Sequence, residues 1–152
     1  MVCNSLNIYK NDMIVGGAGE KRVLIGEHAF ARCGLTTLFT YLLQCSTLYK
    51  NITGIWSPIV IWYFNPMAED YSYTKPSPVC SNILEPTKER ALVEYMLFHD
   101  YFDEGILIEG IQTYGFQHDN DWSKLYPVAK YFGLSVDKLE YWINEALNDF
   151  EV

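Results

Sequence analysis

The sequence lacks any hydrophobic run long enough to cross a membrane. Its longest apolar stretch runs from Ile55 to Phe64 and is interrupted by Ser57 and Pro58. That stretch is about half of the roughly 20 residues that a membrane helix needs. The residues from Met1 onward do not combine a basic segment with a long apolar one, so they do not predict a secretory signal. We therefore expect a cytoplasmic protein that has no membrane partner.

Basic residues are scarce. The chain has 11 Lys and Arg residues against 19 Asp and Glu residues, which gives a formal net charge of -8. A surplus of negative charge opposes the counterion release that supplies most nonspecific affinity for nucleic acid. We therefore do not expect direct binding to nucleic acid, and a basic protein is the partner that the charge favours.

Cysteine motifs are missing as well. The four cysteines are Cys3, Cys33, Cys45 and Cys80. They are widely spaced, form no C-x-x-C pair and have no histidine at a zinc-ligand interval. The pattern predicts buried free thiols in a reducing cytosol, with no disulfide framework, no metal site and no cofactor.

What the sequence does contain is enough apolar material for a core. Its 152 residues are 49% hydrophobic and 16% aromatic, far from the composition of disordered segments. A chain of this length buries roughly 70% of its unfolded surface. We expect residues 1–152 to fold as one domain.

The first half of the chain, residues 1–84, carries strand signals around one short helix. We predict a hairpin of residues 13–15 and 21–25 around the glycines of residues 16–19. A helix is expected from Glu27 to Cys33, ended by Gly34. Residues 35–49 fit either a helix or a pair of strands.

The aromatic segment that follows predicts the centre of a small antiparallel sheet. Residues 52–64 are rich in Ile, Val, Trp and Tyr, which favours one long strand with an irregularity at Pro58. Residues 67–78 are polar and predict an extended excursion or edge strand before residues 80–84.

The second half, residues 85–152, changes to helical periodicity and predicts four helices. Pro86 and Thr87 open the first, which should end near His99, and Asp103 caps the second, which should stop at Gly115. The third carries the stripe from Trp122 to Phe132, with Asp119 or Asp121 as its cap, and the fourth is capped by Ser135. Strands followed by helices predict an α+β fold.

One stretch has the spacing of a helix-turn-helix, and its residues are Ala129, Gly133, Ser135 and Leu139. The second helix of that motif would carry Asp137, Glu140 and Glu145 against Lys138 alone. Such a face repels phosphates, so the charge favours a helical hairpin used for packing over a transcription regulator.

A second candidate site lies between the first two predicted helices, where the titratable residues are His99, Asp100, Asp103 and Glu104. Such groups can bind a divalent ion or exchange a proton, which would make a small metal-dependent enzyme. Helix capping and the helix dipole explain the same residues without any chemistry. No nucleophile motif is present, so we predict no catalytic residue.

Aromatic residues in and beside the polar excursion form a third candidate. They are Trp56, Tyr63, Tyr71 and Tyr73. Exposed aromatics among polar residues are typical anchors of protein interfaces, and aromatics also cover edge strands. The sequence leaves both interpretations open.

The order of these segments resembles the C-terminal domain of AbiEi-type antitoxins of type IV, abortive-infection toxin–antitoxin systems. The matching pieces are Ile25–Leu35, the aromatic strand at residues 59–64, and the terminal helical region from Asp121. Pro86–Glu94 resembles the helix start P-x-E-R-A-L-L-D of that family, with one extra residue and a final Glu in place of Asp. The resemblance covers residues 23–150 and does not include the winged helix of that family, so it gives no ground for expecting autoregulation through DNA.

The resemblance implies an antitoxin-like, non-catalytic protein-binding domain that neutralises or regulates a nucleotidyltransferase-type toxin in phage defence. We predict that a charged face contacts the partner, and its residues are Glu89, Arg90, Glu94, Asp100, Asp103 and Glu104. Arg90 has an alternative role: it lies among apolar helical neighbours and can instead hold a carboxylate inside the fold, in which case its loss would unfold the domain.

Overall fold

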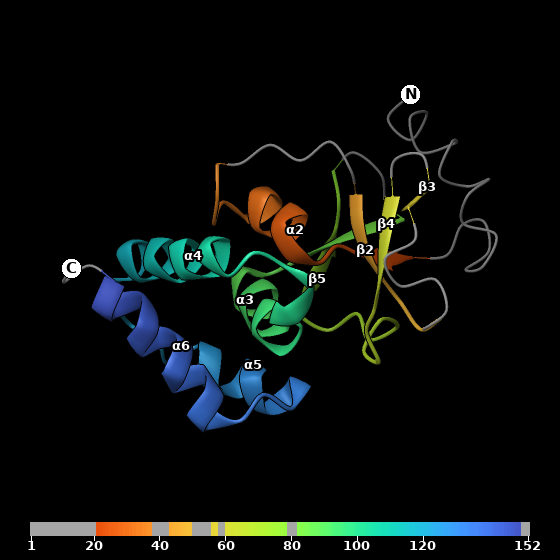
Figure 1. The fold of residues 1–152 in the computed structure, drawn as a ribbon. Helices are drawn as coiled ribbons and strands as arrows, with labels where there is room; N and C mark the ends of the chain where they lie inside the picture. The colour runs from red at the N-terminus through yellow and green to blue at the C-terminus, as the bar shows by residue number, and fades with distance from the viewer. Residues whose placement is uncertain (1–20, 38–42, 50–55, 58–59, 79–81, 150–152) are drawn as a thin grey trace.

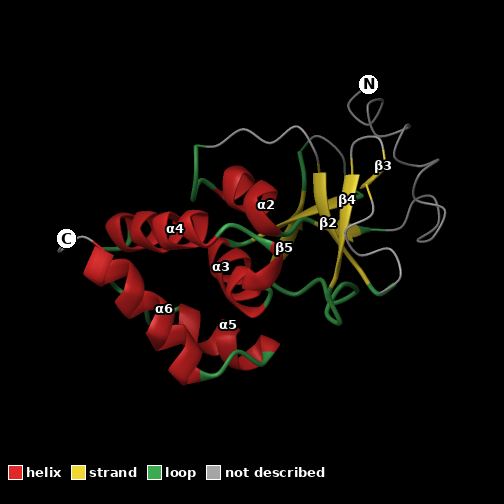
Figure 2. Ribbon diagram, viewed as in Figure 1, coloured by secondary structure: helices red, strands yellow, loops and turns green. Residues whose placement is uncertain are grey.

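The computed structural model describes residues 21–37, 43–49, 56–57, 60–78 and 82–149. Within these ranges the helices gather on one side of the molecule and the strands on the other (Figure 1, Figure 2). The helices are α2 (Gly26–Cys33), α3 (Lys88–Leu97), α4 (Glu104–Gln117), α5 (Leu125–Phe132), α6 (Val136–Asp149) and the 3-10 helix η3 (His99–Tyr101). The predicted α+β class, with a C-terminal cluster of helices, is confirmed.

The strands form two small sheets of three strands each. Their bounds are β1 (Arg22–Val23), β2 (Leu43–Thr47), β3 (Trp56–Ser57), β4 (Val60–Phe64), β5 (Thr74–Pro76) and β6 (Ile83–Pro86). The strand orders are β1-β6-β5 and β2-β4-β3. In each sheet two strands that are neighbours in the sequence pair antiparallel: β5 with β6, and β3 with β4. The third strand comes from earlier in the chain and pairs parallel: β1 with β6, and β2 with β4. The prediction of an antiparallel sheet is therefore wrong, because both described sheets are mixed.

The long strand predicted for residues 52–64 is also wrong, because the chain turns back within it. Trp56 pairs with Ile61 and Ser57 pairs with Val60, so β3 and β4 form a tight antiparallel pair. Pro58 has no N–H to give to a ladder, which agrees with a strand that stops before it. The side chain of Trp56 and residues 50–55 and 58–59 lie outside the part of the chain that is described.

The remaining strand predictions have mixed outcomes. Residues 43–47 form the strand β2, so a helix through residues 35–49 is wrong, and residues 38–42, where a second strand of a pair could fall, lie outside the described ranges. Residues 13–20 of the predicted hairpin lie outside the described ranges, and β1 pairs instead with β6, about sixty residues away in the chain. The predicted edge strand within residues 67–78 is confirmed, since β5 lies at the edge of its sheet.

The caps predicted at Asp103 and Ser135 are confirmed, and Thr87, which was predicted to open its helix, proves to be the cap of α3. The side chain of Thr87 accepts a hydrogen bond from Arg90 N, that of Asp103 from Ile106 N, and that of Ser135 from Lys138 N. Each satisfies a backbone N–H of a first helical turn that has no partner within the helix.

The predicted bounds around α4 and α5 need correction. Helix α4 passes Gly115 and ends at Gln117. A Cβ on Gly115 would lie 2.6 Å from the ring of Trp122, so this glycine permits a close approach and does not end the helix. Helix α5 begins only at Leu125, and Asp121 accepts a hydrogen bond from Ser123 N in the turn before it.

One hydrophobic core joins the two halves of the chain. Phe30 of α2 is fully buried and stacks on Tyr95 of α3, with the ring centroids 4.4 Å apart. Helix α4 closes over Phe30 at Gly110, where an added Cβ would meet the ring at 2.5 Å. The absence of a side chain at Gly110 therefore sets how closely α4 approaches α2.

We expect the substitution Gly110→Ala to lower the free energy of unfolding by about 1–3 kcal/mol, because the new methyl group overlaps a buried ring. Urea denaturation followed by circular dichroism measures this. The matched control is Gly105→Ala in the first turn of α4, where the new Cβ would approach only the exposed Asp103 carboxylate, at 3.0 Å. An equal loss in both variants would contradict the packing argument.

Candidate functional site

The predicted charged face divides into a buried part and an exposed part. Arg90 and Glu94 are 0% and 1% exposed, so the prediction that they contact a partner is wrong. Asp100, Asp103 and Glu104 are exposed, in η3 and at the start of α4. Glu89 is half-buried, and one of its carboxylate oxygens accepts a hydrogen bond of 2.8 Å from the hydroxyl of Tyr114.

Arg90 holds a carboxylate inside the fold. This is the alternative role that was predicted for Arg90 because its helical neighbours are apolar. Its Nε and Nη2 atoms donate to the two carboxylate oxygens of Glu94, at 3.0 and 3.3 Å. The side-chain amide of Asn65 donates to Glu94 Oε2 at 2.6 Å, and Asn65 is fully buried. We call Arg90, Glu94 and Asn65 the buried arginine network.

The rest of the guanidinium holds the loop between β4 and β5. Nη1 of Arg90 donates to the backbone oxygens of Asp70 and Ser72, at 2.6 and 2.7 Å, and Nη2 donates to that of Met67 at 3.4 Å. All five N–H groups of the guanidinium therefore have partners. The guanidinium also lies 4.7 Å from the centroid of the Phe132 ring, which ties α5 to the same network.

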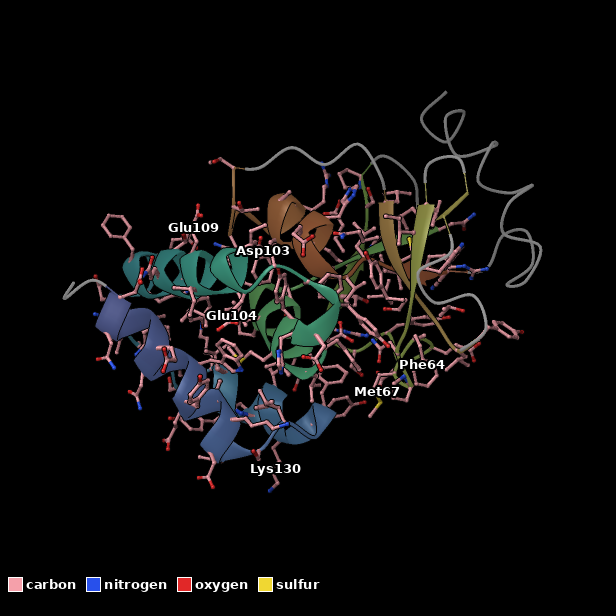
Figure 3. All side chains as sticks on the ribbon, in the orientation of Figure 1. Phe64, Met67, Asp103, Glu104, Glu109 and Lys130 are labelled. Atoms are coloured by element: carbon pink, nitrogen blue, oxygen red, sulfur yellow. The ribbon has the colours of Figure 1, made fainter. Side chains whose placement is uncertain are left out.

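The exposed carboxylates extend from η3 over α4 to the end of α6. Residues 99–149 contain ten Asp and Glu residues and three lysines, a balance of -7, and all thirteen side chains are exposed. Figure 3 shows Asp103, Glu104 and Glu109 along α4, with Lys130 on the far side of the bundle. We call the exposed carboxylates of η3 and α4, which are Asp100, Asp103, Glu104 and Glu109, the acidic face.

Within the acidic face, only Asp103 has a side-chain hydrogen bond that caps a helix, which is α4. The side chain of Asp100 is 92% exposed, and its carboxylate lies 3.4 Å from His99 Nδ1. Glu104 stands in the first turn of α4, where the helix dipole favours an acid. Asp100, Glu104 and Glu109 are therefore the carboxylates of this face that a partner can contact without loss of a helix cap.

Of the predicted aromatic residues, the three whose side chains are described, Tyr63, Tyr71 and Tyr73, do not form one surface. Tyr63 is half-buried and packs on Phe102, with the ring centroids 4.7 Å apart. Tyr71 and Tyr73 are 38% and 40% exposed on the loop that Arg90 holds. Tyr73 lies 5.7 Å, between ring centroids, from Tyr131 of α5. An interface role stays open for Tyr71 and Tyr73, whereas Tyr63 mainly covers the end of β4.

The predicted helix-turn-helix segment forms two packed helices, α5 and α6, with Gly133 in the left-handed conformation between them (φ 84°). Ala129 and Leu139 are buried, as that motif requires. The exposed residues of α6 include Asp137, Glu140 and Glu145. This acidic surface opposes insertion of α6 into a DNA groove.

His99, Asp100, Asp103 and Glu104, the predicted cluster of titratable residues, do not converge on one site. His99 packs against the ring of Trp142, with centroids 5.4 Å apart, and its nearest described carboxylate is that of Asp100. His118 Nδ1 lies 2.9 Å from the backbone oxygen of Tyr114. Over the described ranges, no group of three or more His, Cys, Asp or Glu side chains is placed to hold a metal ion.

A second buried polar network forms around Tyr95 of α3. The hydroxyl of Tyr95 donates to Glu27 Oε2 at 2.8 Å and also lies 2.6 Å from the backbone oxygen of Asp103. Gln44 of β2 donates to Glu27 Oε1 at 3.2 Å. Burial and the Glu27 carboxylate raise the pKa of Tyr95 far above its usual range. The partners come from three segments that are far apart in the chain, so no local motif marks this network. The one feature visible in the sequence is Tyr95 itself, since a tyrosine at a buried helical position usually needs a hydrogen-bond partner.

The chain matches no protein-family model, and a search of curated proteins finds no match. In the ranges that the structure describes, every helix is too short or too polar to span a bilayer.

We expect Arg90→Met to lower the free energy of unfolding by about 3–5 kcal/mol, because it leaves the buried Glu94 carboxylate without its cation. The double variant Arg90→Met/Glu94→Met should lose less than the sum of the two single variants, since it removes both charges. Denaturant unfolding of all three variants measures the coupling. A single variant that stays within about 1 kcal/mol of the parent would contradict the network's structural role.

The two described cysteines, Cys33 and Cys45, are free thiols, and burial raises their pKa to about 11 and about 12. The unfolded chain therefore loses these thiol protons before the folded chain does as pH rises. We expect the free energy of unfolding to fall between about pH 9 and 12, by up to about 1.4 kcal/mol per pH unit for each thiol. Urea titrations at several pH values measure this, and Cys45→Ala should reduce the slope. A slope unchanged in that variant would contradict the assignment.

Proposed function

We propose that this chain is a non-catalytic protein-binding domain whose acidic face binds a basic protein. The observation that carries the proposal is the imbalance of residues 99–149, where ten exposed carboxylates face solvent with only three lysines among them. Their excess of negative charge attracts a partner of opposite charge and speeds the association of the two proteins.

The buried arginine network supports the same proposal, because it holds α3, which leads into η3, in place. Arg90 and Glu94 are buried as a neutral pair, so they leave the charge of the acidic face unchanged. The carboxylates of Asp100 and Glu104 then project from short, well-packed elements. A rigid acidic surface loses little conformational freedom on binding, which favours affinity.

The partner class follows from the resemblance to AbiEi-type antitoxins. We propose a nucleotidyltransferase-type toxin, whose nucleic-acid-handling surface would be basic, and an antitoxin-like role in phage defence. The acidic face would cover that basic surface. A DNA-binding role for α5 and α6 is the alternative, and the negative charge of α6 disfavours it.

We expect the double reversal Asp100→Lys/Glu104→Lys to weaken partner binding by at least about tenfold, because it turns two attractive contacts into repulsive ones. Asp103 is left unchanged because it caps α4. The tagged chain would be purified from its native host, its stoichiometric partner identified by mass spectrometry, and the affinity then measured with the purified pair.

The matched control is Glu69→Lys on the β4–β5 loop, which lies outside residues 99–149 and changes the net charge by as much as either single reversal, Asp100→Lys or Glu104→Lys. Glu69 is exposed and lacks a side-chain partner among the described residues. Retained affinity in the first variant, with circular dichroism showing an intact fold, would remove the acidic face as the interface. Recovery of duplex DNA alone, with an affinity that falls steeply as salt rises, would favour the DNA-binding alternative.

A further inference from the structure

A pocket of about 310 Å³ opens where the end of α2, the edge of the β5–β6 pair and the start of α3 meet. Its polar and charged lining residues are Arg32, Thr74, Lys75, Glu85, Thr87 and Lys88. The volume is at the lower end of the range for small-molecule sites, which starts at about 300 Å³. The pocket is made by two separate stretches of the chain, residues 32–33 and 74–88, so no local sequence motif marks it.

The lining of this pocket is positive although the protein is acidic. Three cationic side chains and one carboxylate give a balance of +2, whereas the whole chain carries -8. Lys75 lies opposite Glu85 in the β5–β6 ladder, so the two side chains leave the same face of the sheet. The ammonium group of Lys75 has no partner within the described ranges and is exposed.

The single carboxylate of the lining is neutralised by the protein itself. Glu85 is 5% exposed, and both Nε and Nη2 of Arg32 lie 2.8 Å from its Oε2 atom. A carboxylate this deeply buried requires such a partner. With Arg32 and Glu85 paired, the charges left over are those of Lys75 and Lys88.

Lys88 and the start of α3 add hydrogen-bond donors. Lys88 Nζ donates to Gln117 Oε1 at 2.7 Å, which uses one of its three protons. Thr87 caps α3 as an acceptor, so its hydroxyl proton is available to a ligand. The first N–H groups of α3 lack partners within the helix, and the positive end of its dipole lies there.

Cys33 also lines this pocket, and its chemistry does not compete with an anion site. Its thiol donates to the backbone oxygen of Phe30 at 3.7 Å. Burial raises the pKa of this thiol to about 11, so at neutral pH it is uncharged and neither repels an anion nor acts as a nucleophile.

We propose that this pocket binds a small phosphate-bearing molecule, with Lys75 and Lys88 contacting the phosphate and Thr87 donating to it. The excess charge of +2 matches a phosphate monoester, which carries about -1.5 to -2 at neutral pH. A carboxylate carries only one charge and leaves one lysine uncompensated. This inference stands apart from the acidic face, since the pocket shares no residue with it.

The test is isothermal titration calorimetry of the full chain at constant ionic strength, with AMP, inorganic phosphate and acetate as probes. We expect saturable binding of AMP and inorganic phosphate, and at least about tenfold weaker binding of acetate. Lys75→Gln and Lys88→Gln should each weaken AMP binding by about tenfold, since each removes a charge-assisted hydrogen bond. Lys88→Arg keeps the charge and should keep most of the affinity.

The matched control is Lys130→Gln, which removes an exposed lysine of α5 outside this pocket and should leave AMP binding unchanged. The proposal is overturned if no phosphate probe binds saturably at millimolar concentration. It is also overturned if acetate binds as tightly as phosphate, or if Lys130→Gln weakens binding as much as Lys75→Gln does. Circular dichroism on each variant shows whether the fold is intact, and Lys75 is exposed enough that its loss should not disturb it.

Discussion

The buried arginine network is the interaction on which most of the arrangement depends. A fully buried guanidinium is costly unless every N–H group has a partner and the charge is balanced. Here Glu94 balances the charge, and three backbone oxygens of the β4–β5 loop take the remaining donors. One side chain thereby fixes helix α3, the loop that leads into β5, and the contact with Phe132 on α5.

The same network separates the two charged surfaces of the molecule. The loop that Arg90 holds leads into β5, which carries Thr74 and Lys75 to the positive pocket. Helix α3, which Arg90 joins to the β4–β5 loop, leads to η3 and to the acidic face at the start of α4. A protein with a net charge of -8 thus presents a negative surface on its helices and a small positive pocket beside its strands.

These two surfaces have different physical requirements. The acidic face needs only exposure and a stable backbone, since steering of a charged partner depends on the summed field. The pocket needs convergence of side chains from α2, β5, β6 and α3, so it depends on how the elements pack. Damage to the buried arginine network would therefore disturb the pocket directly, and would reach the acidic face only through loss of the fold.

The sequence by itself determined the helical half of the protein, because capping and periodicity act over a few residues. Thr87, Asp103 and Ser135 cap the helices where local chemistry placed them, and the α+β class followed. Only the tertiary structure decided the parallel pairing of β1 with β6 and of β2 with β4, since pairing partners lie far apart in the chain. It also decided that Arg90 and Glu94 are internal while Asp100 and Glu104 are exposed. All four residues are charged, so their chemical type does not separate the buried pair from the exposed pair, and burial depends on what other elements pack against them.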